Sequence, residues 1–196
     1  VDVVGIENRG GFSIGGLVGC VEELAIASIN ACSTGEDVTV SSCLNAGGLV
    51  GSTFMYSKTI ITNCTNKATV TSQYSGCGGI IATGDSLDIV NCKNYGKIQG
   101  STLYTGAEKT AGIGTGGIVG GSGLLNESIS VNYGTIEGKD GVGGIIGSTR
   151  IQGDENTPYV YNTTVTTFCG NEGSVSGQQG VGGICGEGQF GAFAVY

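Results

Sequence analysis

The sequence predicts an all-β protein, a parallel β-solenoid (β-helix) of about six coils, each made of three short strands. Two observations predict this fold. A glycine-rich pentad recurs six times along the chain, and a second motif centred on asparagine travels with it in a fixed order. Repeats of roughly 30 residues cannot bury an apolar face alone, whereas stacked copies bury a continuous core. We therefore expect residues 1–196 to form a single repeat domain.

Composition favours β-structure and excludes several other classes of protein. The 196 residues include 40 glycines, one proline and no tryptophan or histidine, and 39% of them are hydrophobic. The glycines follow no every-third-residue period, which excludes collagen, and the hydrophobic content is too high for a disordered chain. Valine, isoleucine and threonine dominate the segments between the glycines, as they do in strands.

Charge and hydropathy argue against two kinds of partner. The net charge is −8 and the eight Lys and Arg residues are scattered, so we expect no nucleic-acid binding. No apolar run approaches the roughly 18 residues of a spanning helix, so we expect no membrane insertion. The first residue is Val1 rather than Met, which indicates a processed chain or an excised fragment.

The pentad has the form Gly-Gly-aliphatic-aliphatic-Gly and predicts one strand of each repeat. Its copies begin at residues 15, 47, 78, 116, 143 and 182, and the third copy ends in Ala82 instead of glycine. Stacking predicts an internal ladder of third-position side chains at about 4.8 Å per step. Its members are Leu17, Leu49, Ile80, Ile118, Ile145 and Ile184. The fourth position is also apolar, so it either fills a corner or lies on a face that something else covers.

The asparagine motif, Asn-x-(Gly/Ala)-x-apolar, predicts a corner followed by a strand. Its asparagines are Asn8, Asn66, Asn94, Asn132 and Asn171, and Thr34 stands in the equivalent place in one repeat. We interpret this column as structural, with each side chain hydrogen-bonded to its own backbone and to the next asparagine. A ligand-binding role is the alternative.

A short β-rich run precedes the asparagine and often ends in a cysteine two residues before it. Stacking places Cys32, Cys64, Cys92 and Cys169 in one column, which we expect to be buried, inward-facing and mostly unbonded to one another. Rungs about 4.8 Å apart are too widely spaced for a relaxed disulfide, whose Cβ atoms lie roughly 3.8 Å apart. Disulfides remain open for the cysteines outside this column, which are Cys20, Cys43, Cys77 and Cys185.

Other local patterns carry weaker expectations. The chain has no Cys-x-x-Cys and no histidine, so we expect no metal site and no cofactor. The apolar spacing in residues 20–32 is compatible with a short helix between coils.

The sequence resembles a known family of bacterial repeats. The combination of "GGIVG" with "NCKNYG" is similar to the GLUG-motif repeats of large bacterial surface proteins, including non-catalytic parts of immunoglobulin A peptidases and adhesin-like proteins. The resemblance covers residues 6–186. It implies an extracellular repeat module at the bacterial cell surface, and it says little about activity because such repeats occur in proteins of differing function.

We expect a structural or adhesive module, either a stalk segment or a filament-forming subunit, and not an enzyme. The absence of histidine removes the commonest general base, and no pair of carboxylates recurs in register. The alternative is the β-helical part of a glycan-active lyase or hydrolase, for which Asp85 and Asp88 are the best catalytic candidates.

Interaction residues are expected in the irregular segments of the chain. Insertions around 98–112 and 148–164 lengthen two repeats, and such insertions often form the binding edge of a solenoid for a host protein or a glycan. The apolar C-terminal tail suggests head-to-tail association with a second copy or with flanking repeats, unless it folds back over its own last coil. The candidate interaction residues are Tyr104, Tyr159, Tyr161, Phe190, Phe193 and Tyr196.

Overall fold

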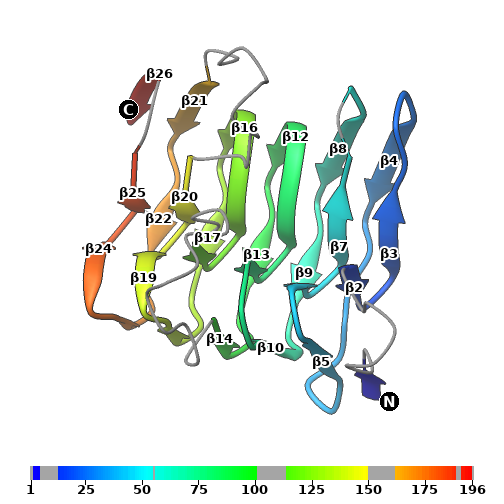
Figure 1. The fold of residues 1–196 in the computed structure, drawn as a ribbon, viewed down its shortest axis with the longest axis horizontal. Helices are drawn as coiled ribbons and strands as arrows, with labels where there is room; N and C mark the ends of the chain where they lie inside the picture. The colour runs from blue at the N-terminus through cyan, green and yellow to red at the C-terminus, as the bar shows by residue number, and fades with distance from the viewer. Residues whose placement is uncertain are drawn as a thin grey trace.

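The computed structural model describes residues 2–4, 13–54, 56–100, 114–149, 162–188 and 191–195, and these residues contain strands and no helix. The strands form four sheets, named A to D here, and every strand pair among the described residues is parallel. Strands of one sheet lie side by side from the N-terminal to the C-terminal end of the molecule (Figure 1). The predicted all-β class and the parallel pairing are therefore confirmed.

The strands are assigned to the sheets as follows. Sheet A contains β1 (Asp2–Val4), β5 (Thr39–Ser42), β10 (Thr69–Ser72), β14 (Ile98–Gln99), β18 (Ile136–Glu137) and β23 (Val175–Ser176). Sheet B contains β2 (Ser13–Gly15), β6 (Asn45–Gly47), β11 (Cys77–Gly78), β15 (Thr115–Gly116), β19 (Asp140–Gly143) and β24 (Gln179–Gly182). Sheet C contains β3 (Val18–Val21), β4 (Ile26–Asn30), β7 (Val50–Thr53), β8 (Lys58–Thr62), β12 (Ile81–Val90), β16 (Val119–Ser128), β20 (Ile146–Ser148), β21 (Asn162–Thr167), β25 (Cys185–Glu187) and β26 (Gly191–Val195). Sheet D contains β9 (Thr65–Asn66), β13 (Lys93–Asn94), β17 (Val131–Asn132) and β22 (Gly170–Asn171).

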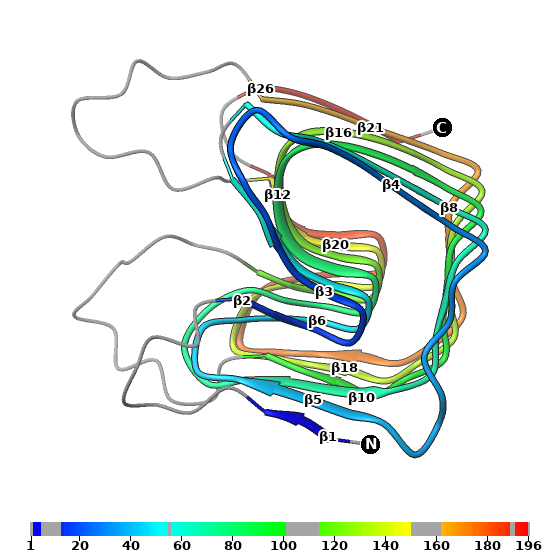
Figure 2. The ribbon, with the colours of Figure 1, turned by 90° about the vertical axis from the view of Figure 1, so that its right-hand side faces the viewer.

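Each turn of the chain lies over the preceding one, as Figure 2 shows. A turn contributes to four sheets, whereas the sequence predicts three strands, because the segments carrying the asparagines form sheet D by themselves. The helix considered for residues 20–32 is not formed. Residues of that segment belong to strands β3 and β4, which pair with β7 and β8.

The pentad forms a corner and not a strand, which corrects the prediction. In the second copy Gly47 ends β6, Gly48 and Leu49 form a bend, and Val50 begins β7. Leu49 and Val50 are both fully buried in one core cluster, because the chain turns between them. The fourth position of the pentad therefore fills a corner, and it does not lie on a strand face that another element covers.

The third pentad positions stack by backbone hydrogen bonds from each N–H to the carbonyl of the next turn. The N–H of Ile80 lies 2.9 Å from the carbonyl oxygen of Ile118, whose own N–H lies 3.0 Å from that of Ile145. Leu49, Ile80, Ile118 and Ile145 are fully buried, and Ile184 is half-buried on the last turn. Leu17 does not belong to the interior: it is 47% exposed because no further turn among the described residues covers it.

The two motifs occur together because they pack on each other. A Cβ atom placed on Gly79, the second residue of its pentad, would clash with the carbonyl oxygen of Gly117 and would lie 2.6 Å from the side chain of Asn94. Real Cβ atoms do not approach so closely, so only glycine fits beside the asparagine. The same packing joins Gly48 to Asn66, Gly117 to Asn132 and Gly144 to Asn171.

The interior is divided into two apolar clusters. One is enclosed by sheet C, sheet D and the pentad corners, and it contains the stacked isoleucines together with Cys64 and Cys92. The other lies between sheets A and B and is built around Val40, Val70 and Val142. Sheet D therefore has a buried inner face and an exposed outer face.

Candidate functional site

The predicted interaction residues fall mostly outside the part of the chain that the structure describes. Tyr104, Tyr159, Tyr161, Phe190 and Tyr196 lie outside it, as does Asn8 of the asparagine column. The backbone of Phe193 belongs to β26, which pairs with β21 of the same chain. Two arrangements were considered for the tail, association with a second copy and folding back over the last coil. The backbone of β26 folds back over the last turn of its own chain.

The two catalytic candidates are engaged in local contacts. The backbone N–H of Tyr56 donates to Asp85 Oδ2 at 2.8 Å, and Lys58 Nζ lies 2.7 Å from Asp88 Oδ2. Both contacts join β12 to the turn before it. They lie at the first residue of β8 and just before it. They account for these carboxylates as structural groups of sheet C.

The outer face of sheet D, with the corner before it, forms a continuous surface that we call the D flank. It consists of three rows of outward-facing residues that run along the stack of turns. The corner row is Ala31, Asn63, Asn91, Ile129 and Phe168. The middle row is Ser33, Thr65, Lys93, Val131 and Gly170, and the last row is Lys67, Tyr95, Tyr133 and Glu172.

The corner row places bulky apolar residues where the backbone disfavours them. All five of its members have positive φ, with values of 56° at Asn63, 57° at Ile129 and 53° at Phe168. Asparagine tolerates this left-handed region, whereas other non-glycine residues lose roughly 1–2 kcal/mol there, and a β-branched residue is an outlier. Ile129 is nevertheless 54% exposed and Phe168 78% exposed. Burial in the described structure therefore offsets little of the strain.

The last row brings two tyrosines into a stack at the centre of the D flank. The rings of Tyr95 and Tyr133 are parallel to within 7°, and their centroids lie 4.8 Å apart. Their outer edges remain in solvent, with 48% and 37% exposure. Parallel rings at rung spacing follow from equivalent positions in successive turns, and they produce a flat apolar surface beside Ile129 and Val131.

Charge is distributed unevenly along the D flank. Lys67 and Lys93 lie on the turns toward the N-terminus, and Glu172 lies on the last turn. Lys67 pairs with Glu36 at 3.2 Å, while Lys93 takes part in none of the three ion pairs between described residues. The turn that carries Ile129, Val131 and Tyr133 therefore has the cation Lys93 on the turn before it and the anion Glu172 on the turn after it.

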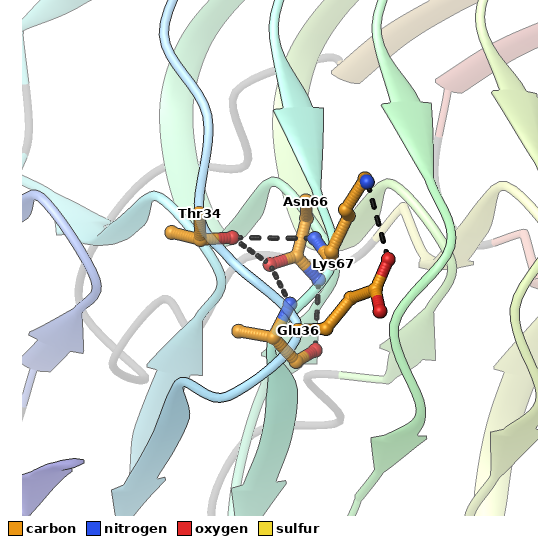
Figure 3. A network of polar contacts seen from close by, with 5 residues as sticks. Thr34, Glu36, Asn66 and Lys67 are labelled. Carbon is orange, nitrogen blue, oxygen red and sulfur yellow. Dashed lines mark hydrogen bonds and ion pairs between the residues drawn. The ribbon is translucent and has the colours of Figure 1, made fainter. Parts of the chain in front are cut away.

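A ladder of hydrogen-bonded asparagine side chains lies on the inner side of the D flank. Asn66 Nδ2 donates to Asn94 Oδ1 at 2.8 Å, Asn94 to Asn132 at 2.7 Å and Asn132 to Asn171 at 2.7 Å. Each Nδ2 also donates to the backbone carbonyl two residues on, at 3.0–3.2 Å. Figure 3 shows the start of the ladder, where Thr34 Oγ1 donates to Asn66 Oδ1 at 2.5 Å. The amides satisfy one another and the corner backbone, which fixes the strands of sheet D in register.

Glu127 is a fully buried carboxyl in the cluster enclosed by sheets C and D. It lies in the same column as Ile29, Ile61 and Ile89, and Thr166 follows it on the next turn. Neither carboxylate oxygen has a hydrogen-bond partner among the described residues, and the Ser130 hydroxyl donates to the carbonyl of Ser128 instead. Burial raises the pKa of Glu127 to about 8, although the nearby Ser130 hydroxyl opposes part of that rise.

The cysteines contribute packing and not cross-links. None of the eight forms a disulfide, including the four outside the column for which disulfides were open. Cys64 and Cys92 are buried, whereas Cys32 and Cys169 are half-buried. Burial raises the pKa of Cys92 and of Cys169 to about 12, so both thiols stay protonated at neutral pH. Within the described ranges, no three or more His, Cys, Asp or Glu side chains gather where a metal ion could bind.

The D flank and Glu127 were not predicted from the sequence. Ile129 and Phe168 align with Asn63 and Asn91, so an apolar residue at a corner favouring asparagine was an available signal. The repeat around Asn132 has Ser130 in place of the column cysteine, which hides the alignment of Glu127 with Ile89.

Within the described part of the chain, no helix combines the length and the apolar character needed to span a membrane. Comparison of the sequence with protein-family models, with curated proteins and with solved structures returned no match in any of the three.

Proposed function

We propose that the chain is a parallel β-solenoid of about six coils, and that it serves as a structural or adhesive repeat module of a bacterial protein at the cell surface. Membership of the GLUG-motif repeats, an extracellular location and a non-enzymatic role belong to the same proposal. Its function in this view is to extend, present a surface and associate.

The register of sheet A is the observation that carries the proposal. Val70 pairs with Ile98, Ile98 with Ile136 and Ile136 with Val175, so equivalent residues of four successive repeats lie in one line. Sheets B, C and D repeat the same relation with their own residues. An array in which each repeat contacts mainly its neighbours is suited to build length.

Both ends of the stack favour addition of further turns. Sheet B ends in β2 at one side and β24 at the other, and each of these strands pairs with one neighbour only among the described residues. Leu17 at one end and Val181 at the other are each 47% exposed. An unpaired parallel edge beside an exposed apolar core is a template for another strand, from flanking repeats or from a second copy joined head to tail.

Charge placed at these ends tests the proposal. We expect the 196-residue chain to form end-to-end oligomers, visible as short filaments by negative-stain electron microscopy and as a concentration-dependent species in sedimentation velocity. Leu17→Lys and Val181→Lys should each suppress these oligomers without changing the β-sheet circular dichroism spectrum, because a lysine would have to be buried at the joint.

Gln73→Lys is the matched control, because Gln73 is exposed in the middle of the stack. It should leave the oligomers intact. A chain that stays monomeric at its highest soluble concentration, or filaments that survive both end substitutions, would contradict association through the ends.

A further inference from the structure

The D flank combines exposed apolar residues with a backbone conformation that penalises them. At the equivalent corner of two preceding turns, Asn63 and Asn91 relieve this penalty and also form a side-chain ladder. Asn91 Nδ2 donates to Asn63 Oδ1 at 2.8 Å, and Asn63 Nδ2 to Asn30 Oδ1 at 3.0 Å. The ladder stops at Ile129 and Phe168, which are exposed and have positive φ. Strained residues are concentrated at functional sites, so Ile129 and Phe168 are candidates for an interaction outside the fold.

We propose that the D flank is a side-by-side dimer interface, in which a second copy of this chain packs its own D flank antiparallel around a two-fold axis at β17. This interface is separate from the ends of the stack and does not depend on the proposed end-to-end association. The two-fold axis brings Ile129, Val131 and Tyr133 against their counterparts in the second copy.

The charge distribution selects this occupant and this orientation. With the axis at β17, the turn that carries Glu172 faces the turn that carries Lys93 and Tyr95 in the second copy. A cation then meets an anion on both sides of an apolar centre, which is the self-complementarity that an isologous interface requires. A parallel arrangement would place Lys93 against Lys93, so charge disfavours it.

The apolar centre of the D flank is better suited to bind a protein surface than to stack on a flat small molecule. Tyr95 and Tyr133 occupy one face of each other's ring, so they offer edges and the flat side of the pair. Tyrosine and exposed aliphatic side chains are suited to the centre of an interface, with charged residues at its rim.

Substitutions at Ile129 and Phe168 should change two measured quantities in opposite directions: relief of backbone strain stabilises the monomer, and loss of contact weakens the dimer. We expect Ile129→Asn and Phe168→Asn to raise the melting temperature of the monomer, because asparagine tolerates positive φ. The Ile129→Asn side chain would also extend the ladder from Asn91. The same substitutions together should weaken the dimer by at least about tenfold in dissociation constant, because they remove Ile129 from its apolar centre and Phe168 from the turn beside it.

The experiment uses sedimentation equilibrium in the Leu17→Lys/Val181→Lys background, so that failure of the end-to-end proposal does not obscure the result. The control is Tyr56→Asn, since Tyr56 is also aromatic, 77% exposed and at φ 60°, but lies at the opposite end of β8 from the D flank. It should leave the dimer unchanged.

Charge exchange tests the orientation. Lys93→Glu and Glu172→Lys should each weaken the dimer severalfold, and the double variant should restore it, because each single change places like charges opposite each other. A monomer at every accessible concentration overturns the proposal. A dimer that is unaffected by Ile129→Asn/Phe168→Asn, or single charge variants that the double variant does not rescue, would do so as well.

Discussion

Glu127 makes the stability of the protein depend on pH. Its folded pKa is about 8, above the value of 4.5 expected for an unfolded chain. Its stabilising contribution is therefore complete below about pH 4.5, decreases as the pH rises, and is lost above about pH 8. The lowered pKa of Glu137 acts at more acidic pH, and the raised pKa values of Cys92 and Cys169 act at more alkaline pH.

We expect the free energy of unfolding to fall between about pH 5 and pH 8, by roughly 3–5 kcal/mol for a shift of this size. Urea denaturation at a series of pH values measures it. Glu127→Gln should remove the slope, and Glu127→Ile should be more stable than the parent at about pH 8 because isoleucine occupies this column in three other turns. Stability that is constant or rises over this window would show that the carboxyl is not buried without a partner.

The thiols report burial residue by residue. We expect Cys64, Cys77 and Cys92, which are fully buried, to resist alkylation in the native protein and to react only after unfolding. Mass spectrometry of the labelled peptides measures the reaction at each position. Cys43, which is half-buried, serves as the internal reference. Rapid native labelling of Cys92 would be incompatible with its place in the core.

Within each turn, the pentad corner is held by close contact between glycine and asparagine. We expect Gly79→Ala to destabilise the protein by roughly 1–3 kcal/mol or more, because the added methyl would lie against the carbonyl of Gly117 and the amide of Asn94. Thermal denaturation measures the change. Gly183→Ala is the matched control: Gly183 is the same position of the last pentad, and a Cβ there meets no atom within 4 Å. Equal effects at the two positions would refute the packing argument.

The asparagine ladder should contribute most to the stability of the protein in the interior of sheet D. Asn94→Ala leaves Asn66 without its acceptor, Asn132 without its donor and the corner backbone at Gly96 unpaired. We expect a loss of about 2–4 kcal/mol in urea denaturation, since buried unsatisfied polar groups cost about 1–3 kcal/mol each. Asn171→Ala, at the half-buried last rung, should cost clearly less. A ladder that is only a surface feature would give small, equal losses.

The sequence predicts the fold where a motif repeats. It does not predict the structure at positions where a repeat departs from its motif. Periodic glycines and asparagines predict stacking and parallel pairing, because equivalent positions recur in a fixed order. The corner at Leu49 was predicted as a strand, since two adjacent apolar residues do not distinguish a buried bend from a strand covered on both faces. Phe168 and Glu127 depend on register across repeats of unequal length, which local patterns do not define.

Over the full stack of turns, the four parallel sheets share one stacking direction (Figures 1 and 2). Both apolar clusters continue from turn to turn. Among the described residues, the arrangement includes the edge strands at the two ends of the stack and the D flank. In the assembly that we propose, the ends would add further turns and give length, and the D flank would pair with that of a second copy. Together they would allow a surface module to form bundled filaments.

The fold rests on the stacking of equivalent residues from successive repeats, one above another. Nuclear Overhauser contacts between isoleucine methyl groups measure this stacking, in chain labelled at isoleucine and carrying the two lysine end substitutions. We expect contacts between Ile80 and Ile118 and between Ile118 and Ile145, which are adjacent rungs of the buried ladder. Absence of these contacts, with contacts instead between isoleucines of strands that follow each other in the sequence, would contradict the stacked parallel fold.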